Sequence, residues 1–102
     1  MLTFLIARTE KDAWKAIGKH EEAIPELTDA IIVTTHGGNW AQGARMQRVY
    51  IAPGAEDGPC YDRVIRVARR NMIKMRDADR WMRRIHPDGS WTEEVPDGVQ
   101  LQ

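Results

Sequence analysis

The sequence lacks a second cysteine, a net charge and any long apolar run, and each absence excludes a class of protein. Cys60 is the single cysteine in 102 residues, so no internal disulfide can form and a reducing compartment is expected. No segment approaches the roughly 18 apolar residues that a membrane-spanning helix needs. The apolar start, Met1–Arg8, is too short for a secretory leader. We therefore expect a soluble protein of the cytoplasm, or of a host cell's cytoplasm, with no membrane partner.

Motifs for nucleotide binding and metal chemistry are also absent. The sequence contains neither G-x-G-x-x-G nor G-x-x-x-x-G-K-[ST], the patterns that hold phosphates in many α/β proteins. His20, His36 and His86 are scattered without metal-ligand spacing, and His20 is expected on the surface of a helix. The predictions are no catalytic residue, no cofactor and no metal.

The first part of the chain has the order of a β-α-β unit. Leu2–Ala7 and Ala30–Thr35 are predicted strands, and the apolar run in the second predicts burial on both faces, as in a parallel sheet. Between them, Glu10–Ala23 has helical spacing, with Thr9 as its N-cap and Asp12 three residues on.

The middle of the chain continues the alternation. Trp40–Met46 suggests a short helical turn, and Arg48–Ala52 is a third strand. Pro59 suits the first position of a second helix that extends to about Arg76. The apolar stripe of that helix consists of Tyr61, Val64, Ile65, Ala68, Met72 and Met75.

The last segment allows two interpretations. The second helix could extend to His86, or a hairpin could turn at Pro87–Ser90, which has strong turn chemistry. The hairpin is preferred because it would place Arg84 opposite Glu93 and Arg83 opposite Glu94. The fold class expected is thus α/β: a small βαβ-based, largely parallel three-stranded sheet with two main helices and a C-terminal β-hairpin at one edge or end. Residues 1–95 would form a single domain and 96–102 a loose tail.

Charge is unevenly distributed although it sums to zero. Residues 1–59 carry six basic and eight acidic side chains, a net charge of −2. Residues 60–86 carry nine basic and three acidic side chains, a net charge of +6, and residues 87–102 carry four acidic and no basic side chains, a net charge of −4. The anion-free run in the second helix indicates a surface for phosphates or an acidic partner, whereas a solvated helix face is the ordinary alternative. The predicted partner-binding residues are Arg63, Arg66, Arg69, Arg70, Lys74 and Arg76.

The loop after the second strand is a second candidate. It follows a presumed parallel strand, at the end where open α/β sheets bind ligands. Its two glycines permit a nest of backbone N–H groups, and a histidine there could exchange protons near neutral pH. The possible anion loop consists of Thr35, His36, Gly37, Gly38 and Asn39. A plain connection between two strands is the alternative.

Three stretches carry a resemblance: the strand Thr3–Ala7, the following Ala-Arg-Thr-Glu-Lys-Asp-Ala turn into a helix, and Gly43–Ile51. In these the chain resembles small Rossmann-like proteins encoded by actinobacterial bacteriophages, most of them without an assigned function. The resemblance covers Leu2–Pro53. It implies a phage accessory protein that acts inside a bacterium, and it carries over no catalytic residue.

The leading hypothesis is a non-catalytic accessory protein that binds a host protein or nucleic acid through the arginine-rich helix. The alternative is a nucleotide- or small-anion-binding Rossmann-like enzyme that uses the Thr34–Asn39 loop. A homodimer is a third possibility, in which a sheet edge or the tryptophan-bearing hairpin pairs with a second copy.

Overall fold

The computed structural model describes residues 3–36, 48–74 and 81–94, with residues 71–74 described by their backbone alone. In chain order the elements are β1 (Thr3–Ala7), α1 (Glu10–His20), the 3₁₀ helix η1 (Pro25–Asp29), β2 (Ile31–Thr34), β3 (Arg48–Ile51), the 3₁₀ helix η2 (Ala55–Asp57), α2 (Tyr61–Lys74), β4 (Trp81–Ile85) and β5 (Trp91–Glu93). The predicted turn at Trp40–Met46 and the predicted tail at 96–102 lie outside the described residues.

All the strands belong to one mixed sheet with the order β2-β1-β3-β4-β5. The first four strands are mutually parallel, and β5 runs antiparallel to β4. The α/β class and the first β-α-β unit are confirmed. The predicted three-stranded sheet is too small, because the hairpin strand β4 pairs with β3 and makes β3-α2-β4 a second crossover.

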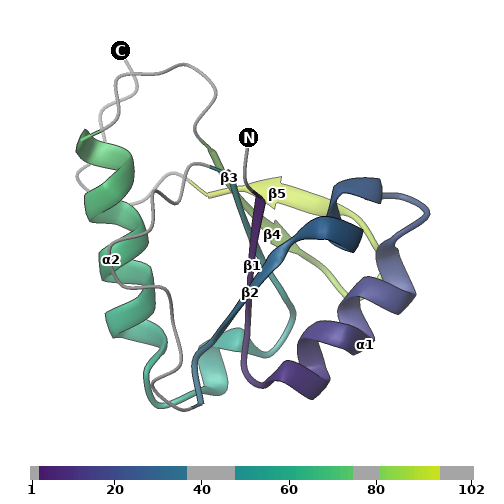
Figure 1. Ribbon diagram of the computed structural model, residues 1–102, viewed down its shortest axis with the longest axis horizontal. Helices are drawn as coiled ribbons and strands as arrows, with labels where there is room; N and C mark the ends of the chain where they lie inside the picture. Colours follow the sequence, from purple (N-terminus) through teal and green to yellow (C-terminus); the bar gives the residue numbers. More distant parts are fainter. Residues whose placement is uncertain (1–2, 37–47, 75–80, 95–102) are drawn as a thin grey trace.

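The two helices cover opposite faces of this sheet (Figure 1). Consecutive residues of β1 point to opposite faces, so Phe4 belongs to the core under α2 and Leu5 to the core under α1. The α2-side cluster consists of Phe4, Ile6, Val33, Val49, Ile51, Ala55, Val64, Ile65, Ala68 and Met82. The α1-side cluster consists of Leu5, Ala7, Ala13, Ala16, Ile17, Ile24, Leu27, Tyr50, Ala52 and Ile85.

Strand β2 corrects one expectation. Burial on both faces was predicted for it, but β2 is the outermost strand, and Ile31 is 38% exposed. The doubly buried strand is β1, which has β2 on one side and β3 on the other, and all of its residues are buried. A short apolar run therefore identified a parallel strand correctly but not its place in the sheet.

The hairpin is confirmed, but its predicted register is wrong by one residue. The observed pairs are Arg83 with Glu93, Arg84 with Thr92, and Ile85 with Trp91. Gly89 has a φ of +93°, its N–H donates to the His86 carbonyl at 2.9 Å, and the His86 N–H donates to the Ser90 carbonyl at 2.8 Å. This is a β-turn followed by a left-handed glycine, so the loop is the three residues Pro87, Asp88 and Gly89 instead of the predicted four, and the strand partners shift by one.

The helix boundaries follow local chemistry. The Asp12 N–H donates to the Thr9 hydroxyl at 3.1 Å, so the predicted N-cap of α1 is confirmed. The helix ends at His20 rather than Ala23. Helix α2 begins at Tyr61, just after Pro59, and its N-terminus is positioned by a 2.7 Å hydrogen bond from the Cys60 N–H to the Thr35 carbonyl.

Candidate functional site

The outward face of α2 carries the arginines that the sequence singled out. Val64, Ile65 and Ala68 are buried against the sheet, and Arg63, Arg66 and Arg70 are exposed on the opposite side of the helix. Within the described part of the chain, no acidic side chain forms an ion pair with these three arginines. No carboxylate of the described ranges therefore neutralises their charge.

The other predicted members of this set are placed differently. Arg69 lies at the flank of α2, half-buried, and its Nε is buried without a hydrogen-bond partner among the described residues. Lys74 is the last residue of α2, where only the backbone is described, and Arg76 lies outside the described residues. We call the exposed surface formed by Arg63, Arg66 and Arg70 the arginine face.

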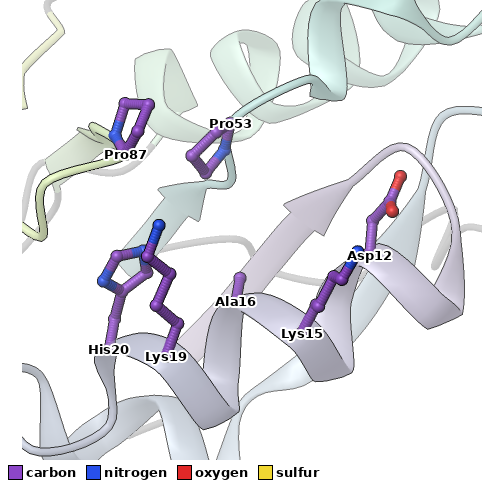
Figure 2. A pocket seen from close by; sticks show the side chains of 7 residues that line it. All are labelled: Asp12, Lys15, Ala16, Lys19, His20, Pro53 and Pro87. Carbon is purple, nitrogen blue, oxygen red and sulfur yellow. The ribbon is translucent and has the colours of Figure 1, made fainter.

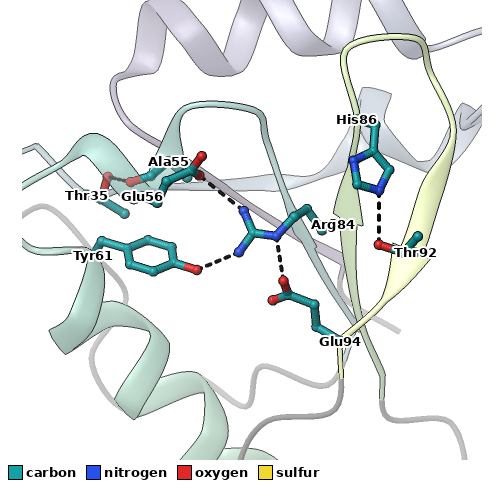
Figure 3. Close-up of polar contacts among 8 residues, drawn as sticks. All are labelled: Thr35, Ala55, Glu56, Tyr61, Arg84, His86, Thr92 and Glu94. Atoms are coloured by element: carbon teal, nitrogen blue, oxygen red, sulfur yellow. Dashed lines mark hydrogen bonds and ion pairs between the residues drawn. The ribbon is translucent and has the colours of Figure 1, made fainter.

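Hydrogen bonds from the Arg84 guanidinium connect β4 to the start of α2 (Figure 3). The Arg84 guanidinium donates to Tyr61 Oη at 2.8 Å, to Glu56 Oε2 at 3.1 Å and to Glu94 Oε1 at 2.5 Å. The hydrogen bond to Glu94 is the main cause that raises the pKa of Arg84 above its already high ordinary value. Glu94, not the predicted Glu93, is thus its partner, and the charge of Arg84 is neutralised within the fold.

The predicted anion loop is only partly described, and Thr35 in it has a structural role. Its hydroxyl donates to the Ala55 carbonyl at 2.7 Å, and its backbone N–H donates to the Ala7 carbonyl at 2.9 Å. Gly58 packs directly on it, since a Cβ there would lie 2.0 Å from Thr35 Oγ1. His36 is exposed, and residues 37–39 lie outside the described part of the chain. The polar groups of Thr35 are used inside the fold, which leaves little for an anion.

Sequence reasoning missed a stack of aromatic rings around Arg83. The guanidinium carbon lies 3.9 Å from the ring centre of Trp81 and 4.0 Å from that of Trp91. Next to it, the Tyr50 hydroxyl donates to Glu26 Oε1 at 2.5 Å and accepts from Arg83 Nη1 at 3.4 Å. The sequence did contain a signal for this contact, because residues 81 and 83 are two apart and so lie on one face of β4. The predicted pairing of Arg83 with Glu94 assigned Arg83 to an ion pair instead.

His20 contradicts the expectation of a surface residue. Its side chain is only 4% exposed, because the β4–β5 turn closes over the end of α1. A Cβ on Gly89 of that turn would lie 3.4 Å from His20 Nδ1. Burial is the first cause that lowers the pKa of His20, followed by the positive charge of Lys19, while Asp88 acts in the opposite direction.

Neither metal-binding chemistry nor a membrane span emerges from the described residues. Within these ranges no group of three or more histidine, cysteine or acidic side chains is placed to hold a metal ion. Among the described helices, none has the length and apolar character to cross a membrane. Comparisons of the chain with models of protein families, with curated proteins and with solved structures gave no match.

Proposed function

We propose that the chain is a non-catalytic accessory protein, of the kind that bacteriophages encode, which binds an acidic surface of a host protein through the arginine face of α2. The observation that carries this proposal is the exposure of Arg63, Arg66 and Arg70 without an ion pair to any described acidic residue. Guanidinium groups bind carboxylates through two parallel hydrogen bonds, so an arginine face suits such a partner better than a lysine face would.

The size of the face favours a local acidic patch. Arg63, Arg66 and Arg70 follow one another at helical spacing and span about 10 Å along the axis, at about 1.5 Å per residue. Packing of α2 on the sheet and the Arg84–Tyr61 hydrogen bond hold the helix in place. A partner therefore meets a preformed surface, which reduces the entropy lost on binding.

The surroundings of the face argue against a long polyanion. Glu56, Asp57 and Asp62 are exposed next to the N-terminal end of α2, and the whole chain has no net charge. The phosphates of an extended duplex would continue past the arginines onto these carboxylates and be repelled. An acidic patch on a protein can be limited to the area opposite the arginines and so avoid these carboxylates. This is why a protein partner is preferred to nucleic acid.

Titration with two defined probes tests the proposal. A labelled glutamate-rich peptide and a labelled mixed-sequence DNA duplex would be titrated with the full chain at low and high salt. The test variant is Arg66→Glu/Arg70→Glu. The matched control is Arg8→Glu/Lys11→Glu, which makes the same change of charge at exposed positions around the start of α1. We expect salt-sensitive peptide binding that the α2 variant loses and the α1 variant keeps.

Two outcomes contradict the proposal. Unchanged peptide binding by Arg66→Glu/Arg70→Glu removes the arginine face from the interaction. Tighter binding of the duplex, with the steep salt dependence of phosphate contacts, assigns the face to nucleic acid instead. If the peptide result is as expected, the natural partner would be sought by affinity capture from nuclease-treated host lysate, with the α2 variant as the control bait.

A further inference from the structure

A pocket unrelated to the arginine face lies on the other side of the sheet. It is enclosed by one side of α1 and by the residues that follow β3 and β4, and its volume is about 210 Å³. Figure 2 shows the α1 side chains along one wall and the two prolines across from them. The described residues that line the pocket are Asp12, Lys15, Ala16, Lys19, His20, Pro53 and Pro87.

The position of the pocket is one at which α/β sheets bind ligands. Pro53 and Pro87 follow the carboxyl ends of two neighbouring parallel strands, β3 and β4. The chain leaves β1 and β3 in opposite directions along the sheet, with α1 on one face and α2 on the other. Crevices outside the carboxyl ends of the strands, near such a reversal, are the general ligand sites of open α/β sheets.

His20 is the side chain in the pocket lining that can exchange a proton near neutral pH. Its side chain is 4% exposed and lines the pocket, yet its imidazole makes no hydrogen bond within the part of the chain that the structure describes. The His20 nitrogens are not among the described side-chain atoms that are both buried and unpaired, so the ring reaches the water of the pocket through its nitrogens. A polar ligand in the pocket can therefore contact them in place of water.

The charges around the pocket select an anion. Lys15 and Lys19 are one helical turn apart on α1, and both line the pocket, Lys19 beside His20 and Lys15 beside Asp12 (Figure 2). Asp12 is the single carboxylate of the lining, and Arg8 lies 3.8 Å from it. Asp88, on the turn packed against His20, already accepts hydrogen bonds from the Ser90 N–H and hydroxyl. The net charge offered to a ligand is therefore positive.

The size and shape indicate a small oxyanion. The volume of about 210 Å³ is smaller than the roughly 300–1,000 Å³ of the usual pocket for a drug-sized ligand. Two ammonium groups and an imidazole on one helix can each donate to a different oxygen of a tetrahedral anion. We propose that this pocket binds a phosphate group, free or on a small organic molecule, through Lys15, Lys19 and His20.

Protonation of His20 should be linked to this binding. Its pKa lies below the ordinary value because of burial and Lys19, so the ring is mostly neutral at neutral pH in the free protein. A bound phosphate favours the imidazolium form and raises that pKa. By linkage, phosphate binds more tightly as the pH falls towards the pKa of His20.

The test uses the full chain with inorganic phosphate as the probe, glycerol phosphate as an organic phosphate and acetate as a carboxylate control. Binding would be followed by the NMR signals of the His20 imidazole and by calorimetry. We expect phosphate to move these signals and to raise the pKa of His20, and acetate to do so only weakly. Lys15→Gln and Lys19→Gln, both at exposed positions, should each weaken phosphate binding about tenfold, the effect of losing one charge-assisted hydrogen bond.

The matched control is Lys11→Gln, which removes one charge from an exposed position of α1 outside the pocket lining and should bind phosphate like the unmodified chain. Phosphate at millimolar concentration that leaves the His20 signals unmoved overturns the proposal. So does equal affinity in Lys15→Gln/Lys19→Gln, or binding of acetate as tight as that of phosphate. Because the pocket and the arginine face lie on different helices, failure here leaves the result for the acidic partner unaffected, and the reverse also holds.

Discussion

Tyr50 is a residue whose side-chain pKa is clearly raised by the fold. Its side chain is 1% exposed, and its hydroxyl donates to Glu26. Burial first, and then this hydrogen bond, raise the pKa of Tyr50 from its ordinary 10.0 to about 12. The neutral phenol is therefore favoured in the fold. Its contribution to stability is complete below pH 10 and is lost as the pH rises towards about 12.

Comparison of the chain with Tyr50→Phe checks this shift. The variant should be less stable by about 1 kcal/mol near neutral pH, because it loses a buried hydrogen bond. Denaturant unfolding at about pH 9 and about pH 11 should then show a larger loss of stability for the unmodified chain than for the variant. An equal loss in both proteins would show that the phenol of Tyr50 has an ordinary pKa.

Substitutions of Arg83 test how much its contacts with the two tryptophan rings contribute to stability. Its guanidinium carbon lies 3.9 Å from the ring centre of Trp81 and 4.0 Å from that of Trp91. We expect Arg83→Gln to lower the free energy of unfolding by about 1–2 kcal/mol, from two cation–π contacts. Arg83→Lys should restore only part of it, because an ammonium group cannot stack as a planar guanidinium does. Full stability in Arg83→Gln, measured by denaturant unfolding, would show that the stack contributes nothing.

Residue roles were predictable where they depend on close neighbours in the chain. Thr9 and its hydrogen bond to the Asp12 N–H could be read from residues three apart. The stack around Arg83 and the burial of His20 depend on the β4–β5 turn, which shifts the strand register and brings Gly89 against α1. Because the loop is one residue shorter than predicted, every residue of the hairpin pairs with a different partner from the one predicted.

Among the elements, the hairpin turn depends on Gly89. Its φ of +93° is one that residues with a Cβ rarely adopt, and an added Cβ would meet His20 Nδ1 at 3.4 Å. Gly89→Ala should therefore destabilise the protein by about 1–2 kcal/mol. Thermal unfolding followed by circular dichroism measures the effect.

Gly18 is the matched control for this substitution. It lies exposed in the last turn of α1, and a Cβ there would have no atom within 4 Å. Gly18→Ala should stabilise the protein by up to about 1 kcal/mol, since alanine favours the helix. A loss of stability in Gly18→Ala as large as that in Gly89→Ala would contradict the assignment of the cost to the left-handed turn.

The existence and type of the elements followed from periodicity, but their order in the sheet did not. The apolar stripe containing Val64, Ile65 and Ala68 correctly predicted which side of α2 is buried. No local pattern showed that β4 would extend the sheet beside β3, or that β2 would be an edge strand. Strand order is decided by packing of both helices on the whole sheet, which no short segment of sequence encodes.

At the scale of the whole molecule, the two hydrophobic clusters share the same strands. Phe4 and Leu5 are neighbours in β1, both fully buried, and belong to the α2-side and the α1-side cluster respectively. Each helix thus packs on a sheet that the other helix also stabilises. Loss of either cluster should release both helices together, and the described fold should behave as one cooperative unit.

Phe4→Ala and Leu5→Ala test this coupling from the two faces. Each should lower the free energy of unfolding by about 3–5 kcal/mol, a large part of the stability of a domain this small. Helix content by circular dichroism and tryptophan fluorescence should nevertheless fall in one coincident transition in both variants. Among the described tryptophans, Trp14 lies in α1 and Trp81 packs against the α1-side cluster, so their fluorescence reports that face, whereas circular dichroism reports both helices. If Phe4→Ala loses helix content while the fluorescence transition stays unchanged, α2 unfolds separately, and the arginine face rests on an independent element rather than on the sheet.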